Sequence, residues 1–328
     1  MAATPIVISA EMRAERKRRP FLVELLIRLV KEKPLGTVGG VIVLVLLLTG
    51  IFAEALAPYG YNEMNLADRL QVPSGTHLLG TDNLGRDLLS RIIYGARISM
   101  YVGLGATIIG TFLNTLIGTI SGYLGGKTDL IIQRLVDSWM CLPTLFIILT
   151  VMTIVGPGLI QVTLVIGVIN GLHGGIRVKR SAVIGIKENM YVEAARAIGA
   201  PATNIMLRHI LPNIMPVVII SFTLNIGGAI LMESTLSFLG FGIPPPVPSW
   251  GGMLSGPGRQ YMLLAPWMAM WPGLALALVV YGFNMLGDAM RDLLDPRLRG
   301  GLGRFAGVEE RRAKRATKAG VISATSQK

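Results

Sequence analysis

Long uncharged apolar runs are the feature that most restricts the fold of this chain. A helix that crosses the hydrocarbon core of a bilayer, roughly 30 Å thick, needs about 20 apolar residues at about 1.5 Å per residue. Runs of this kind occur at residues 36–53, 98–126, 138–175, 210–232 and 260–287. The third run is too long for one crossing, and Gly156-Pro157-Gly158 in its middle favours a turn. The sequence therefore predicts an all-α integral membrane protein with about six transmembrane helices.

Composition and charge agree with a membrane protein. Of the 328 residues, 52% are hydrophobic and only 15% are charged, and the net charge is +12. A positive charge of this size could indicate nucleic-acid binding, but the basic residues flank the apolar runs instead. Those before the first run and after the last run are Arg13, Arg16, Lys17, Arg18, Arg19, Arg28, Lys31 and Lys33, and Arg291, Arg297, Arg299, Arg304, Arg311, Arg312, Lys314, Arg315 and Lys318. The positive-inside rule therefore places both termini in the cytoplasm and predicts no nucleic-acid partner.

The same patterns divide the chain into segments. We expect a basic cytoplasmic segment at 1–34, the first transmembrane helix at 35–57, an external segment at 58–97, a five-helix core at 98–290 with a cytoplasmic loop at 177–213, and a cytoplasmic tail at 291–328. The first and last segments are polar and charged, so we expect them to be loosely ordered away from the bilayer surface. The external segment should become helical after Asp87. Its arginines at positions 69, 86, 91 and 97 do not fit the positive-inside rule.

Two features near the first run and the second run resemble processing or nucleotide motifs, and we reject both. Ala55-Leu56-Ala57 resembles a signal cleavage site, but a long basic segment precedes the run and Pro58 follows at once, so a retained anchor is expected. The sequence from Gly125 to Thr128 resembles the end of a phosphate-binding loop, but Ser121 stands where the first glycine belongs. We therefore predict that another subunit binds any ATP.

Enzyme signatures are missing from the sequence. It contains no HExxH zinc motif, no G-x-S-x-G elbow and no pair of cysteines, since Cys141 is alone. The three histidines, His77, His173 and His209, lie far apart. We predict no catalytic residue, metal site or cofactor site on this chain.

The cytoplasmic loop holds the most informative stretch, residues 187–213. Asn189 is suited to cap a short helix, Gly199 suits the left-handed position at its C-terminal end, and Pro201 suits the first turn of a second helix that should end before Pro212.

The first of these two helices is amphipathic. Tyr191, Ala194, Ala195 and Ile198 share one face, and the two alanines leave it shallow enough for another protein to approach closely. Glu193 and Arg196 are spaced to pair beside this face. The pattern allows either a contact with a partner subunit or an ordinary amphipathic loop helix.

Four segments, taken together, resemble one family. Glu193-Ala194-Ala195, Gly199 and Leu211-Pro212 resemble the EAA loop of ABC importer permeases, although His209 stands where that pattern has isoleucine. The segments 77–99, 236–251 and 288–300 resemble the peptide-importer branch of the same family. The inner end of the fourth span, 172–177, departs from the family pattern.

The resemblance implies a type I permease subunit of a bacterial inner-membrane importer. Its partners would be a homologous permease, two ATP-binding subunits that carry ATP and Mg, a periplasmic or lipid-anchored solute-binding protein, and membrane lipid. The segment 58–97 would then be periplasmic. The residues that would couple the permease to the ATP-binding subunits are Tyr191, Glu193, Ala194, Ala195, Ile198, Gly199, Leu211 and Pro212.

The resemblance also implies the substrate class. Peptides of the dipeptide or oligopeptide class are the expected substrate, with glutathione or a nickel chelate as alternatives. A stand-alone secondary transporter would show repeated halves or several charges inside the membrane, and neither is clear in this sequence. A membrane enzyme is the third function considered, after the importer permease and the secondary transporter.

Three further regions carry site predictions. Glu233, and with it Asn225, could line the translocation path or a subunit interface, or Glu233 could make an ordinary hydrogen bond between packed helices. Pro245 and Pro246 lie in a proline-rich stretch that we expect to be stiff and extended, beside Trp250, which suits a membrane interface. The resemblance implies that the solute-binding protein docks there; the alternative is a rigid spacer.

Overall fold

The computed structural model describes residues 21–294, and our expectations for 1–20 and for the tail 295–328 lie outside this part. The described chain is helical, with an isolated β-bridge between Thr81 and Asp87. Its elements are α1 (Phe21–Glu32), α2 (Pro34–Ile51), α3 (Ala53–Leu56), η2 (Leu66–Asp68), α4 (Leu88–Leu124), α5 (Gly126–Met140), α6 (Thr144–Val155), α7 (Leu159–Gly171), α8 (Gly175–Lys187), α9 (Met190–Ala197), α10 (Ala202–Ile205), η3 (Met206–Ile210), α11 (Leu211–Phe238), α12 (Trp250–Leu254), α13 (Gly256–Gln260) and α14 (Trp267–Leu294).

The number of membrane spans agrees with the sequence. Within the described residues, four helices are long and apolar enough to cross a bilayer: Pro34–Ile51, Leu88–Leu124, Ala202–Phe238 and Trp267–Leu294. Two bent pairs, α5 with α6 at 84° and α7 with α8 at 45°, raise the total to six if each pair is one span. The break expected at residues 156–158 is confirmed, because Gly156 and Gly158 have φ of 87° and 157° between α6 and α7.

The start of α4 is set by a side-chain cap. The Asp87 carboxylate accepts a hydrogen bond from the backbone N–H of Ser90 at 2.8 Å, so one of the free N–H groups of the first turn is satisfied. The expected helix after Asp87 is therefore confirmed. This helix is continuous with the second span, so the span begins ten residues before the apolar run that identified it.

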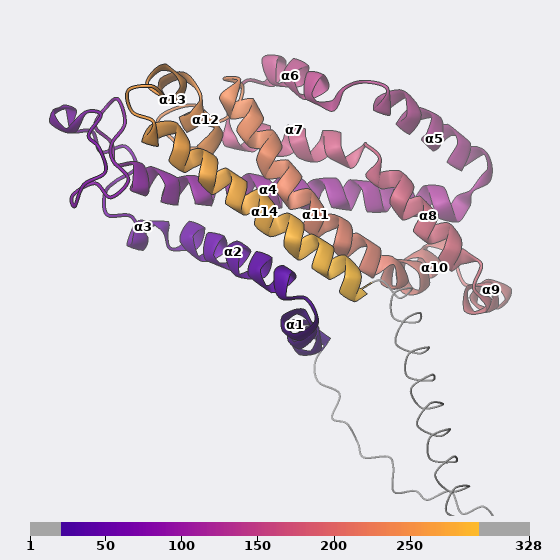
Figure 1. Ribbon diagram of the computed structural model, residues 1–328. Coiled ribbons are helices and arrows are strands. Elements are labelled where there is room, and N and C mark those ends of the chain that lie inside the picture. Colours follow the sequence, from indigo (N-terminus) through magenta and orange to yellow (C-terminus); the bar gives the residue numbers. More distant parts are fainter. Residues whose placement is uncertain (1–20, 295–328) are drawn as a thin grey trace, which may run out of the picture.

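The expectation that the whole basic N-terminal segment is loosely ordered is wrong. Its last part forms α1, because Leu29 is buried against Ala289 and Leu293 of α14. Figure 1 shows α1 set across the end of α2.

The second helix expected within residues 187–213 was predicted to end before Pro212, and this prediction is wrong. The helix continues from α10 through the π-helical turn η3 into α11. Proline removes a backbone donor, and a wider turn accommodates this loss inside a helix. The side chain of Asn213 donates to the carbonyl oxygen of His209 at 2.6 Å and supplies a further hydrogen bond at this turn.

The four external arginines that do not fit the positive-inside rule have local partners. Their contacts are Arg69 with the Tyr261 hydroxyl at 2.9 Å, Arg86 with Asp82 at 2.6 Å, Arg91 with the Tyr61 carbonyl at 2.9 Å, and Arg97 with Glu54 at 2.9 Å. These contacts give the arginines a role in the folding of segment 58–97.

Helix α4 lies at the centre of the bundle, where it contacts α7, α8 and α11, and α2 packs along α14. Small residues allow these close approaches. A methyl carbon at Gly39 of α2 would lie 2.6 Å from the carbonyl oxygen of Gly282 in α14, whereas one at Gly40 would make ordinary contacts with the ends of the Leu286 and Leu29 side chains, at 3.7 and 3.9 Å. Glycine is therefore required at 39 but not at 40.

We predict opposite effects for alanine at these neighbouring positions. Gly39→Ala should lower the stability of the purified protein by about 1–3 kcal/mol, because it forces α2 away from α14. Gly40→Ala should leave stability unchanged or raise it slightly, since alanine favours the helix. Thermal unfolding in detergent measures both, and equal shifts for the two variants would contradict the close contact.

Candidate functional site

The loop helix α9 ends as the sequence predicts. Gly199 has φ of 80°, the N–H of Gly199 donates to the carbonyl of Arg196 at 3.0 Å, and the N–H of Ala200 donates to that of Ala195 at 3.1 Å. These two bonds form a Schellman motif, which satisfies the last free carbonyl groups of the helix. The direction in which the chain leaves α9 is therefore set by a left-handed residue.

The start of α9 differs in detail from the sequence prediction. Asn189 occupies the N-cap position as expected, but its side chain makes no capping bond and donates to the carbonyl of Ile186 at 2.9 Å. Glu193 and Arg196 were expected to pair, but no ion pair joins them in the part of the chain that the structure describes. Arg196 lies over the ring of Tyr123 at 5.8 Å instead, so it fastens α9 to the end of α4.

One face of α9 is buried in this chain. Val192 and Ala195 are 0% and 7% exposed, and they pack in a cluster with Val183 of α8 and with Ile210 and Ile214. The expectation that Ala195 belongs to an exposed stripe is therefore wrong. A short helix of two turns needs a buried face to stay attached to the bundle, and positions i and i+3 supply it here.

The opposite face of α9 is apolar and open. Ile198 is 86% exposed, Met190 is 82% exposed and Tyr191 is 44% exposed, and Glu193 and Ala194 are exposed beside them. Apolar side chains gathered on an exposed face indicate a contact surface. Leu211 packs partly against the cluster beneath α9 and Pro212 is exposed, so these two lie beside the helix and not on the same face.

Ion pairs hold α8, the helix before α9, to α5. Arg180 forms two bonds of 2.5 Å to the carboxylate of Asp129, and Arg177 pairs with Asp137. Arg134 also lies near Asp137, at 3.8 Å, but Arg177 is the closer partner. Neither contact between helices could be predicted from the sequence, because the paired residues lie 40 and 51 positions apart.

The acidic residue of the fifth span is fully enclosed. Glu233 is 0% exposed, and its carboxylate accepts hydrogen bonds from the hydroxyl groups of Ser237 at 2.7 Å and Ser234 at 3.3 Å. It reaches neither the surface of the chain nor a cavity in this conformation. Ser234 and Ser237 both belong to α11, as Glu233 does, so these are bonds within one helix, and a role on the translocation path or at an interface stays a prediction for Glu233.

Asn225, unlike the buried Glu233, is exposed. It lines a polar cavity of about 160 Å³ together with Asn114, Asn170 and His173. These residues come from α4, from α7 and from the break before α8. A position on the translocation path or at an interface stays a prediction for Asn225.

The proline-rich external stretch turns instead of extending. The peptide bond between Pro245 and Pro246 is cis, and both rings are exposed. Trp250 is only 1% exposed, and its indole N–H donates to the carbonyl of Ile92 at 3.1 Å. The expectation that Trp250 lies at a membrane interface or a docking surface is therefore wrong, because its ring fills the space beside Gly95 on α4.

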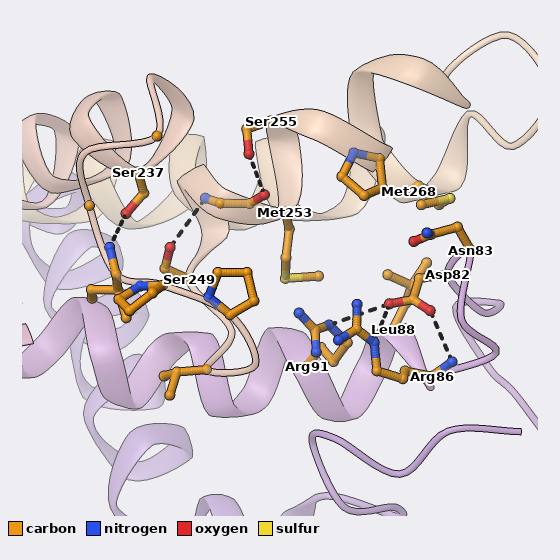
Figure 2. Close-up of a pocket in the computed structure, with 18 of the residues that line it drawn as sticks. Asp82, Asn83, Arg86, Leu88, Arg91, Ser237, Ser249, Met253, Ser255 and Met268 are labelled. Atoms are coloured by element: carbon orange, nitrogen blue, oxygen red, sulfur yellow. Dashed lines mark hydrogen bonds and ion pairs between the residues drawn. The ribbon is translucent and has the colours of Figure 1, made fainter. Parts of the chain in front are cut away.

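A second cavity opens beside this turn and was missed by the sequence analysis. It has a volume of about 240 Å³ and is walled on one side by Asp82, Arg86 and Arg91 and on the other by the prolines and α12 (Figure 2). The segment 77–99, which resembles the peptide-importer branch, supplies the charged wall. Across residues 21–294, no group of three or more His, Cys, Asp or Glu residues is arranged to hold a metal.

Comparison with known proteins covers both halves of the chain. The family described as "Binding-protein-dependent transport system inner membrane component" matches residues 114–300, and the "N-terminal TM domain of oligopeptide transport permease C" matches residues 24–73. The first match contains the loop 177–213 and the last two spans.

Individual relatives align over most of their own length. A dipeptide transport system permease of Alkalihalophilus pseudofirmus is 40% identical over 82% of this chain and 88% of its own. A probable D,D-dipeptide transport system permease of Escherichia coli is 37% identical over 90% and 99%. A glutathione transport system permease of Pectobacterium atrosepticum is 38% identical over 80% and 86%. With its apolar spanning helices, this chain therefore belongs to the family of binding-protein-dependent transport system inner membrane components.

Proposed function

We propose that this chain is the permease subunit of an ATP-driven importer that passes short peptides across the bacterial inner membrane. The observation that carries the proposal is similarity over 80–90% of the chain to permeases named for dipeptides, D,D-dipeptides and glutathione. Glutathione is itself a tripeptide, so a short peptide is the chemistry common to these names. The proposed complex contains a homologous permease, two ATP-binding subunits and an external solute-binding protein.

The open face of α9 is the proposed contact with an ATP-binding subunit. Ile198, Met190 and Tyr191 would enter a groove on that subunit, while Val192 and Ala195 hold α9 to its own bundle. Movement of the ATP-binding subunits would then pull on α9 and, through the ion pairs of Asp129 and Asp137, on α5 and α8 together. ATP and Mg would be bound by these partner subunits, and this chain would supply no catalytic group.

The orientation of the chain in the membrane follows from the same proposal. The α9 end of the bundle faces the cytoplasm, and both termini lie on that side, in agreement with the positive-inside rule. The exposed basic residues near α9, such as Arg177, support this orientation. The arginines of segment 58–97 do not oppose it, because each of them makes at least one contact within the fold that holds it in place.

Uptake by the purified complex tests the function. We expect vesicles that contain both permeases, the ATP-binding subunits and the binding protein to accumulate labelled dialanine only when ATP is supplied. Labelled glutathione and a nickel chelate, assayed in parallel, rank the alternative substrates. Uptake by this chain without ATP-binding subunits would instead indicate a secondary transporter.

The exposed apolar face of α9 gives a second prediction. Ile198→Asp should weaken binding of the ATP-binding subunits by about tenfold or more, because it places a charge in an apolar contact, while leaving the permease folded. The matched control is Leu263→Asp, at a residue that is 93% exposed on the external side. Affinity capture of the ATP-binding subunits by tagged permease measures the difference, and equal capture would rule out this face as the contact.

The left-handed residue after α9 gives a third prediction. A Cβ atom at Gly199 would meet no atom within 4 Å, so only backbone strain opposes substitution. Gly199→Val should uncouple ATP hydrolysis from uptake, because a β-branched residue disfavours φ of 80° and shifts the end of α9. Gly199→Asn should retain most of the coupling, since asparagine tolerates this conformation. The ratio of dialanine imported to ATP hydrolysed measures the effect, and normal coupling in Gly199→Val would contradict it.

A further inference from the structure

The external cavity holds more positive than negative charge. Arg86, Arg91 and Asp82 line it and are 8%, 7% and 4% exposed. One carboxylate oxygen of Asp82 faces both guanidinium groups, at 2.6 Å from Nε of Arg86 and 3.8 Å from Nε of Arg91. The other oxygen accepts from the backbone N–H groups of Leu84 and Arg86. Figure 2 shows the two guanidinium groups beside this one carboxylate.

Nearby carboxylates do not balance this charge. Asp87 is occupied by His77 at 3.0 Å and by Ser90, and it lies outside the wall of the cavity. Among residues 21–294, the only acceptor for a terminal nitrogen of either arginine is the carbonyl of Tyr61, bonded to Nη1 of Arg91. A buried positive charge without a full partner is unfavourable, and an incoming anion with two oxygens suits a guanidinium group well.

The cavity also contains an unused acceptor and an apolar wall. The side-chain oxygen of Asn83 is buried and has no hydrogen-bond partner in the described chain. Pro244, Val247, Met253 and Met268 form much of the rest of the lining. A peptide end offers a carboxylate for the arginines, an N–H for Asn83 and a side chain for the apolar wall. An inorganic anion offers only the first of these.

The size of the cavity limits what it can hold. At about 240 Å³ it is smaller than the roughly 300–1,000 Å³ of pockets that enclose a drug-sized ligand, so it would accept one end of a peptide. It opens beside the exposed Pro245–Pro246 turn, where the solute-binding protein is proposed to dock.

We propose that this cavity is a receiving site for the C-terminal carboxylate of a short peptide, with Arg86 and Arg91 binding the carboxylate and Asn83 accepting from a peptide N–H. The site rests on the proposed peptide-import function and deepens it. It gives the permease its own contact with the substrate at the external end of the bundle, before the peptide enters the membrane.

The test is peptide binding to the assembled complex of both permeases and the ATP-binding subunits in lipid nanodiscs, without binding protein. Saturation-transfer NMR compares dialanine with its C-terminal amide, which lacks the negative charge. We expect dialanine to bind and the amide to bind about tenfold more weakly. Equal binding of the two peptides would overturn the proposal.

Two variants should act in opposite directions. Arg91→Gln should weaken dialanine binding about tenfold, and Arg91→Lys should restore part of it. Asp82→Asn removes the competing carboxylate but keeps an oxygen for the N–H groups of Leu84 and Arg86, so dialanine should bind more tightly. Misfolding cannot produce tighter binding. Arg97→Gln, on the same helix but paired with Glu54 away from the cavity, is the matched control and should bind as the unmodified complex does.

The remaining outcomes separate this site from its alternatives. If Arg91→Gln weakens docking of the binding protein but not binding of dialanine, the arginines receive a carboxylate of that protein and the proposal fails. If the unmodified complex imports dialanine with ATP yet shows no preference for the free acid, only this site is wrong. If it imports no peptide at all, the proposed function itself fails.

Discussion

In a bilayer, every backbone N–H and C=O group must find a partner within the protein, and the rest of this structure depends on that requirement. It explains why the described chain crosses as helices, and why interruptions occur only in particular places. The turn at Gly156 and Gly158 joins two helices, and the N–H of Gly158 is satisfied by the carbonyl of Gly242 at 3.1 Å. The π-helical turn before Pro212 keeps a helix continuous where a proline would otherwise end it.

Features set by a few neighbouring residues could be predicted from the sequence. The helix predicted after Asp87, the break at Gly156 and the left-handed Gly199 each follow from the conformational preferences of a few residues, and the structure confirms them. The number of spans follows equally from the apolar runs. The short helix that carries Glu193, Ala194 and Ala195 could be placed for the same local reasons.

Features that depend on which face of a helix meets another could not be predicted. Ala195 and Val192 share an apolar character with Ile198, and only the position of α8 decides which of them is buried. Trp250 bonds to Ile92, 158 residues away, so its neighbours in the sequence suggested a surface position that the fold does not give it. The charged cavity was missed for the same reason, because its two walls come from segments about 150 residues apart.

One helix connects the two regions that we consider functional. Helix α4 has 37 residues and is therefore about 55 Å long, and Arg91 lies in its first turns beside the external cavity. Near its other end, Tyr123 lies beneath the guanidinium group of Arg196 on α9, and its carbonyl accepts from Lys187 of α8 at 2.7 Å. Close contacts at Gly110, Gly118 and Gly122 pack α4 against α7 and α8 along this length. If the proposed pull on α9 reached α4 through these contacts, it would change the position of Arg91 relative to the Pro245–Pro246 turn. The charge that would receive a peptide thus lies near one end of α4, and the surface that would receive force lies on α9, which contacts the other end of α4 through Arg196 and Tyr123.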